Sequence, residues 1–158
     1  MITDFTFRYY VKEDFDKLLK IVIEFSYHLK RGTERKPGFN KEQFEKDEQK
    51  YLRSNSANKN YRFYICSKKG KFIGFIFFGK QDNDKTKGFV GELYVKPIHR
   101  GKGIATTLLS EAKRWISDQQ CSEVEIDVFT QDKEAMQLYE KPGYKKQKHF
   151  FVTYIKRL

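Results

Sequence analysis

The chain has 158 residues, 39% of them hydrophobic and 16% aromatic, with 32 basic residues against 21 acidic ones and a formal net charge of +11. This size and composition are typical of one globular domain with its own core, and no apolar run reaches the roughly 18 residues that a membrane-spanning helix needs. The N-terminus lacks the features of a secretory signal, so we expect a single domain over residues 1–158, in the cytoplasm and without a membrane partner.

The positive charge does not by itself select a ligand. The lysines are spread over several turn-like segments instead of lining one helix. No helix-turn-helix, zinc-finger or RNP motif is present, so the residues argue against a nucleic-acid partner. Cys66 and Cys121 lie far apart in sequence with no histidine beside them, which predicts reduced core thiols in place of a zinc site or a disulfide.

The first part of the chain predicts a strand at residues 5–11 followed by two helices. Apolar residues at spacings of three and four indicate an amphipathic helix over 13–29. These apolar residues are Phe15, Leu18, Val22, Phe25 and Leu29. A second, short and mostly polar helix should begin after Asn40, which can cap it, with Gln43 in the capping-box position.

The rest of the chain predicts strands first and then alternating elements. Three strands at 61–66, 72–79 and 88–95 are joined by polar links, a pattern that favours an antiparallel meander. The later elements are an apolar-faced helix from Ile104 to Ile116, a half-exposed strand at 122–129, a brief helix at 132–141 and a final strand at 150–158. The order indicates a mixed α/β sheet with one strand-helix-strand crossover.

A basic, glycine-bearing corner, Arg100–Gly103, joins the strand that Pro97 ends to the helix that begins at Ile104. A helix N-terminus has free backbone N–H groups and a partial positive charge, so it attracts anions. The two glycines permit unusual dihedral angles and a close approach of phosphate. Arg100 and Lys102 add positive charge, and the corner therefore predicts a phosphate site.

Two familiar phosphate motifs do not fit this corner. A P-loop needs Gly-x-x-x-x-Gly-Lys-Ser/Thr, a frame that the segment lacks. A dinucleotide fingerprint needs Gly-x-Gly-x-x-Gly, and Thr106 stands where the third glycine belongs. The sequence of this corner therefore argues against both a nucleotide-hydrolysing P-loop and a dinucleotide-binding site.

The corner resembles the acetyl-coenzyme A (acetyl-CoA) signature of the GNAT N-acetyltransferase superfamily, Arg-x-x-Gly-x-Ala, at Arg100, Gly103 and Ala105. A second segment, Ala135–Tyr144 (AMQLYEKPGY), resembles the late A-x-x-L-Y-x-K-x-G-F segment of that superfamily. The resemblance is specific over residues 88–144. It implies a mixed α/β (α+β) fold with a mostly antiparallel central sheet, helices on both faces and a splayed strand pair that binds CoA.

The resemblance also implies which residues hold acetyl-CoA. The strand before the corner should present backbone groups to the pantetheine arm, with the Val95 N–H polarising the thioester carbonyl, and the next strand should splay away from it. Two positions depart from the pattern, since Asp132 replaces a frequent asparagine and Pro142 an aliphatic residue. The expected cofactor-binding residues are Leu93, Tyr94, Val95, Arg100, Gly101, Lys102, Gly103, Ile104, Ala105 and Asp132.

Two side chains are candidates for proton transfer, which needs no metal. A lysine-like ammonium has a pKa near ~10.4, so a base must take a proton before the amine attacks. Glu92 is the candidate base, acting through a water, although alternation along the strand does not say which face it occupies. By resemblance, Tyr139 protonates the departing thiolate.

The leading hypothesis is an N-acetyltransferase that acts on a primary amine of a small molecule. Acetylation of a protein N-terminus or lysine is the alternative among enzymes, and a nucleic-acid-binding module or a silent acetyl-CoA sensor is the alternative of another class. The charge of +11 argues mildly against a strongly cationic acceptor unless carboxylates cluster locally. The sequence leaves open whether the chain forms a homodimer.

Overall fold

The computed structural model describes residues 4–29, 36–128, 133–147 and 152–157. The strands are β1 (Phe5–Tyr9), β2 (Tyr61–Lys68), β3 (Lys71–Lys80), β4 (Lys87–Val95), β5 (Glu123–Val128), β6 (Lys145–Gln147) and β7 (Val152–Arg157). In this part of the chain they form one seven-stranded sheet in the order β1-β2-β3-β4-β5-β7-β6. Neighbouring strands are antiparallel except β4 and β5, which are parallel.

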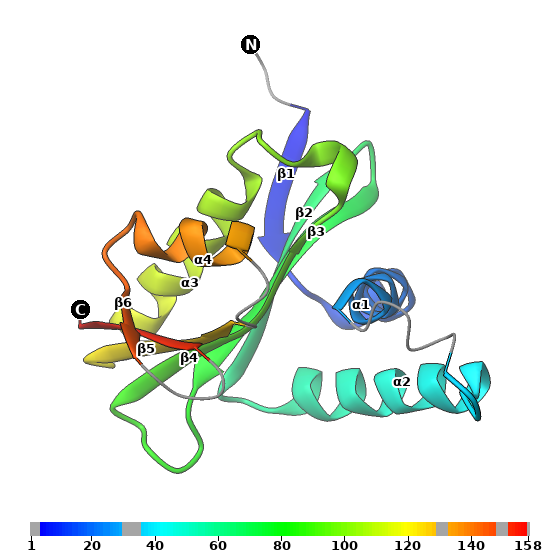
Figure 1. Ribbon diagram of the computed structural model, residues 1–158, viewed down its shortest axis with the longest axis horizontal. Coiled ribbons are helices and arrows are strands. Elements are labelled where there is room, and N and C mark those ends of the chain that lie inside the picture. The colour runs from blue at the N-terminus through cyan, green and yellow to red at the C-terminus, as the bar shows by residue number, and fades with distance from the viewer. Residues whose placement is uncertain (1–3, 30–35, 129–132, 148–151, 158) are drawn as a thin grey trace.

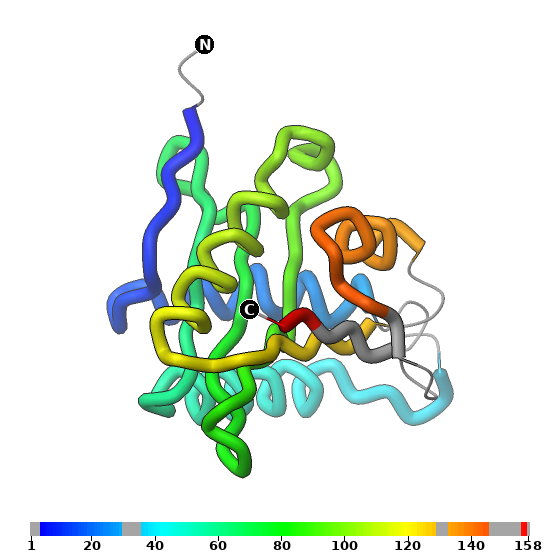
Figure 2. Tube along the Cα trace, turned by 90° about the vertical axis from the view of Figure 1, so that its left-hand side faces the viewer, coloured from blue at the N-terminus to red at the C-terminus, as the bar shows by residue number. Residues whose placement is uncertain are grey.

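Helices cover both faces of this sheet. They are α1 (Phe15–Leu29), α2 (Lys41–Ala57), α3 (Ile104–Asp118) and α4 (Lys133–Glu140). α1 and α2 lie on one side, and α3 and α4 on the other (Figure 1). Figure 2 faces the α3 side and shows that helix in front of the strands, with α1 and α2 behind them. The mixed, mostly antiparallel sheet with helices on both faces is therefore confirmed.

The central strands of the sheet are covered by helices on both faces. Each face therefore has its own apolar core. Phe75 and Tyr94 belong to the cluster beneath α1 and α2, and Ile76 and Val95 to the cluster beneath α3 and α4. β3 is nearly all apolar, and eight of its ten residues are buried. A continuous apolar run of this kind is typical of a strand covered on both faces.

The prediction that the second helix is short was wrong, because α2 has 17 residues. Only Leu52 is fully buried on it, so the apolar signal is weak, and ion pairs one turn apart such as Lys46 with Glu42 support the exposed side. The Asn40 cap is confirmed, since its side chain accepts a hydrogen bond of 3.0 Å from the Gln43 N–H. The Gln43 Nε2 donates a bond of 2.9 Å to Asp47, and the described residues show no return bond from the Asn40 N–H to the Gln43 side chain.

The end of the chain also differs from the prediction. The final strand is present as β7, but β6 precedes it and pairs with it antiparallel. β6 has only three residues, too few to show the alternation by which a strand is recognised in sequence.

The two cysteines lie in the apolar core. Cys66 and Cys121 are buried and free, and burial raises the pKa of the Cys66 thiol to about 11. Among the described residues, none of the helices combines the length and the apolar character needed to span a membrane.

Candidate functional site

The candidate site begins where β4 and β5 separate. Their parallel pairing runs from Lys87 opposite Glu123 to Val90 opposite Ile126 and goes no further, although β4 continues to Val95 and β5 to Val128. The expected splay of the two strands is confirmed. We call the opening between them, beyond Val90 and Ile126, the slot.

The backbone of β4 presents polar groups to the slot. The Lys96 N–H donates to the Ile73 carbonyl at 2.9 Å, so it points toward β3. Because successive residues of a strand point their N–H and C=O groups to opposite edges, those of Val95 and Leu93 face the slot. The Val95 carbonyl indeed accepts a bond of 3.0 Å from Arg100 Nε across that edge.

Tyr94 lies between these two residues and points elsewhere. Its backbone faces β3, and its buried side chain packs in the cluster beneath α1. The hydroxyl donates a bond of 2.9 Å to Glu24 of α1, and Glu24 also pairs with Lys96 at 2.9 Å. A contact between Tyr94 and the cofactor stays a prediction.

The glycine corner has the backbone shape that a bulky anion needs. Gly101 and Gly103 have φ values of 71° and 77°, in the left-handed region that favours glycine. A Cβ at either position would meet nothing within 4 Å, so the corner is open. Gly103 is the N-cap of α3 and has no side chain to cap it. The residues therefore fit a pyrophosphate held by backbone N–H groups.

Arg100 links the corner to both layers of helices. Besides the Val95 carbonyl, its guanidinium contacts Glu134 of α4 at 3.3 Å and His28 of α1 at 3.5 Å. Lys102 is exposed. Both side chains add positive charge where an anion would lie.

Tyr139 lies on α4, on the α3 side of the sheet. Its side chain is buried in the same cluster as Val95, and its ring packs edge-on against Tyr144 with centroids 5.9 Å apart. The Tyr144 hydroxyl is also buried and has no hydrogen-bond partner among the described residues. Asp132, another predicted cofactor contact, lies outside the described residues.

A bulge in β4 decides which way Glu92 faces. Phe77 lies opposite Glu92 and Phe78 opposite Val90, which leaves Gly91 as an extra residue. Phe89 packs on the α2 side, so strict alternation would turn Glu92 toward α3. The bulge instead turns Glu92 to the α2 side, as bulges commonly re-aim a side chain.

Glu92 occupies an unusual environment for a carboxyl group. Burial raises its pKa to about 7; the Tyr51 hydroxyl acts in the opposite direction, and Glu48 raises the pKa further. Its Oε2 atom is buried and has no hydrogen-bond partner among the described residues. Tyr51 and Glu48 come from α2 and were not predicted as site residues, because nothing in the sequence relates them to β4.

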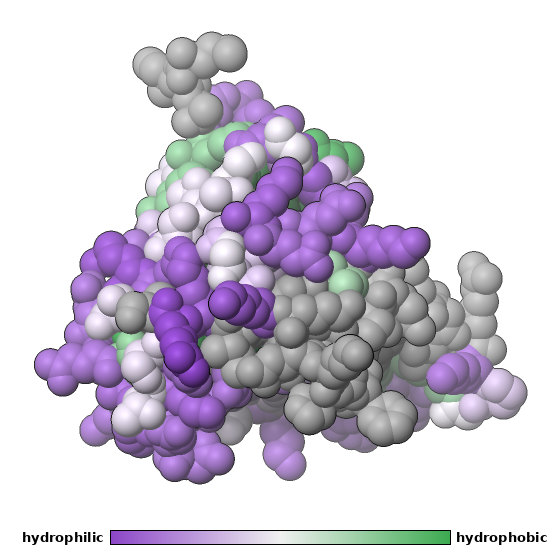
Figure 3. Space-filling view, turned by 60° about the vertical axis from the view of Figure 1, so that its left-hand side comes forward, coloured by the Kyte–Doolittle hydropathy of each residue, from purple (hydrophilic) through white to green (hydrophobic). Residues whose placement is uncertain are grey.

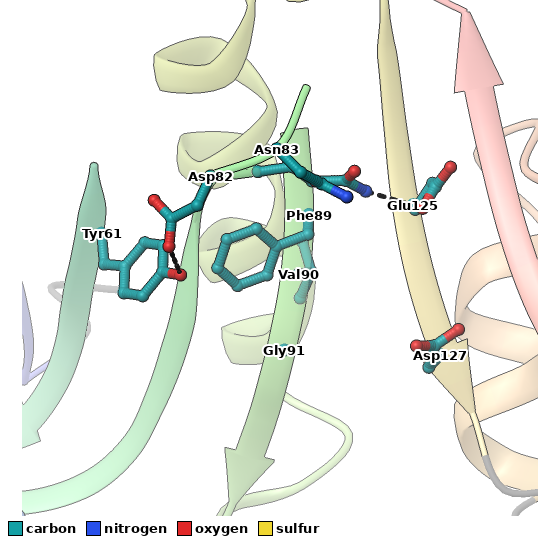
Figure 4. A pocket seen from close by; sticks show the side chains of 9 residues that line it. Tyr61, Asp82, Asn83, Phe89, Val90, Gly91, Glu125 and Asp127 are labelled. Atoms are coloured by element: carbon teal, nitrogen blue, oxygen red, sulfur yellow. Dashed lines mark hydrogen bonds between the residues drawn. The ribbon is translucent and has the colours of Figure 1, made fainter. Parts of the chain in front are cut away.

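A cavity of about 460 Å³ opens on the same face of the sheet as Glu92. We call it the acidic pocket. Figure 4 shows Tyr61 and Asp82 on one side, Phe89 and Gly91 at the base, and Glu125 and Asp127 of β5 on the other side. None of these residues was predicted as a site residue, although the alternation of apolar and acidic residues along β5 does put Glu125 and Asp127 on one side of that strand.

Comparison with known proteins identifies the family. The model of the "Acetyltransferase (GNAT) family" matches residues 25–144. The chain is 29% identical over 93 residues to N-alpha-acetyltransferase MAK3 of Arabidopsis thaliana, a match that covers 58% of this chain and 49% of that one. It is 33% identical over 55 residues to thialysine N-epsilon-acetyltransferase of Bos taurus, covering 35% and 32%. The chain thus spans about half the length, or less, of these curated relatives.

Solved structures show the same fold. The PaiA N-acetyltransferase from Thermoplasma acidophilum, determined in complex with coenzyme A, superimposes with a TM-score of 0.75 at 20% identity, over 98% of this chain and 99% of that one. At this identity the likeness concerns the fold alone. With the splayed strands and the glycine corner, the family match over most of the length settles the classification: the chain belongs to the GNAT family of acetyltransferases.

Proposed function

We propose that the protein transfers an acetyl group from acetyl-CoA to a primary amine of a small molecule. One arrangement supports the proposal: an open, glycine-capped helix N-terminus suited to an anion follows β4, and a buried carboxyl group with a pKa raised to about 7 lies on β4 itself. These are the two features that amide formation from a CoA thioester needs.

The chain would hold acetyl-CoA mainly through its backbone. The N–H groups of Gly101–Ala105 suit the pyrophosphate, and the slot-facing groups of Leu93 and Val95 suit the pantetheine amides. The Val95 N–H would polarise the thioester carbonyl. Acetyl-CoA supplies an activated acetyl group whose sulfur is a good leaving group.

Glu92 would act as the general base. With a pKa near 7 it is about half ionised at neutral pH, which lets it both accept a proton and release it again. Its Oε2 atom has no hydrogen-bond partner among the described residues, so it can accept a hydrogen bond from an ammonium or from a bridging water. The acceptor nitrogen forms the new C–N bond after this proton leaves.

Tyr139 would act as the general acid. As the C–S bond breaks, the hydroxyl gives its proton to the departing sulfur, and the proton taken by Glu92 restores the balance through solvent. Tyr139 is buried in the same apolar cluster as the Val95 side chain, and this shared location supports the role.

A second candidate is acetylation of a protein N-terminus. The N-alpha-acetyltransferases among the relatives favour it. The thialysine N-epsilon-acetyltransferase favours a free small molecule. A catalytically silent acetyl-CoA sensor would bind acetyl-CoA and acetylate neither a protein N-terminus nor a small amine.

One assay distinguishes these candidate functions. The purified protein is mixed with acetyl-CoA and a panel of small amines and short peptides, and released thiol is measured. We expect release with small amines and little with peptides. Release with peptides alone would favour the second candidate, and CoA binding without any release would favour the sensor. Tight nucleic-acid binding with a steep salt dependence, and no thermal shift with CoA, would reject the acetyltransferase proposal.

A further inference from the structure

We infer that the acceptor is a diamine-like molecule: its reacting amine lies at Glu92, and a second cationic nitrogen lies in the acidic pocket. This inference rests on the proposed function and names the substrate class. A diamine, a polyamine or a free amino acid with a basic side chain would have this chemistry.

The lining of the acidic pocket opposes the charge of the whole chain. The chain carries a net charge of +11, yet the described residues around the cavity include three carboxylates and no Lys, Arg or His. Those carboxylates belong to Asp82, Glu125 and Asp127. A local cluster of this kind is the condition under which a basic protein can take a strongly cationic acceptor.

Two of the three pocket carboxylates, Glu125 and Asp82, have ion-pair partners outside the pocket lining. Glu125 contacts Lys87 at 3.3 Å and accepts a bond of 2.7 Å from Gln81, and Asp82 contacts Lys85 at 3.5 Å. The Lys85 and Asp82 side chains are both about half exposed, and exposed ion pairs contribute only about 0–1 kcal/mol. An ammonium that enters the pocket can therefore share the Asp82 carboxylate without breaking a strong ion pair.

Aromatic rings complete the pocket. Tyr61 and Phe89 both line it, and their ring centroids lie 5.2 Å apart. The Tyr61 hydroxyl donates to Asp82 at 2.5 Å, which holds the ring and the carboxylate together. A cation near the face of such rings is attracted by their quadrupoles, and the rings also suit the methylene chain between two amines.

The bulge joins this pocket to the candidate base. Gly91 lines the pocket, and Glu92 follows it directly. A Cβ on Gly91 would press against the Phe77 ring, which is also the ring opposite Glu92 in the sheet. Both residues thus face the α2 side, on which the acidic pocket also opens, so a reacting amine at Glu92 and a second nitrogen in the pocket would lie on the same face of the sheet.

The test compares matched amines and matched variants. Unbranched alkane diamines and the monoamines of equal chain length are assayed with acetyl-CoA, and kcat/KM is measured for the wild type, Asp127→Asn and Glu125→Gln. Glu123→Gln is the control, because it removes the same charge from the same strand at a position that does not line the pocket. We expect wild type to prefer diamines, and each pocket variant to reduce that preference about threefold to fivefold, the effect of one weak ion pair.

The outcomes distinguish this inference from the proposed function. Equal kcat/KM for diamines and monoamines, or equal effects of Asp127→Asn and Glu123→Gln, would overturn the inference and leave the acetyltransferase intact. Absence of turnover with every amine would reject the proposed function. In that case calorimetry with a diamine and the CoA-loaded protein decides: binding that Asp127→Asn weakens supports the pocket, and no binding overturns it.

Discussion

Replacing Glu92 with glutamine should remove a titration near pH 7 from the stability of the protein. The folded state raises the pKa of this carboxyl from 4.5 to about 7, so between those values the folded chain keeps a proton that the unfolded chain has lost. Stability is therefore fully present below about pH 4.5 and falls as pH rises through 7. A difference of about 2.5 pKa units corresponds to about 3 kcal/mol.

Urea unfolding across this pH range measures the effect. The wild type should lose about 3 kcal/mol of unfolding free energy between pH 4.5 and 8 beyond any general trend, whereas Glu92→Gln should follow the general trend alone. Glu42→Gln, an exposed carboxyl on α2, serves as the control and should behave as wild type. A slope that persists in Glu92→Gln would refute the assignment of this titration to Glu92.

The same variant tests catalysis. A base must be ionised to accept a proton, so the kcat/KM of the wild type should rise with pH through about 7. Glu92→Gln should lose that inflection and about a hundredfold in kcat. An unchanged inflection in the variant would mean that another group supplies it.

Three further substitutions test the remaining sites. Tyr139→Phe should lower kcat about a hundredfold with CoA affinity retained. Tyr144→Phe, which removes a buried hydroxyl that has no partner within the described part of the chain, should leave kcat unchanged. Gly103→Ala puts an L-residue at a φ of 77°, so unfolding should show a loss of about 1 kcal/mol and calorimetry weaker CoA binding. Gly88→Ala would drive a methyl group into Ile116 of α3 and should cost about 1–3 kcal/mol in denaturant unfolding.

The elements that sequence predicts well here are those with local signals. The α3 face was recognised because its apolar residues repeat at helical spacing, and Leu108, Ala112 and Ile116 are indeed buried. The start of α2 was recognised because the Asn40 cap depends on residues three positions apart. The length of α2 was missed because its stability comes from exposed ion pairs and from one buried leucine, which leave little periodicity.

The orientation of Glu92 could not be predicted from sequence. Alternation predicts a face only while strand pairing is regular, and the bulge at Gly91 interrupts it. The bulge is a property of β3 and β4 together, since it appears only when Phe77 and Phe78 are placed opposite their partners. The spacing of residues within 88–95 does not indicate the bulge, so the contact between Glu92 and Tyr51 could not be predicted either.

The two halves of the site differ in how they are encoded, and this explains why the cofactor side can be read from sequence and the acceptor side cannot. The proposed anion site is the backbone of one continuous segment, Arg100–Ala105, whose left-handed turns at Gly101 and Gly103 favour glycine. The proposed acceptor side is lined by residues of β2, the β3–β4 connection, β4 and β5. A substitution at any of those side chains does not require a change in the backbone conformation of its own segment. Relatives can therefore share the cofactor segment and still accept different amines. It follows that exchanging the acidic pocket residues should change acceptor preference while leaving CoA affinity as it is, and a parallel loss of both would contradict this division.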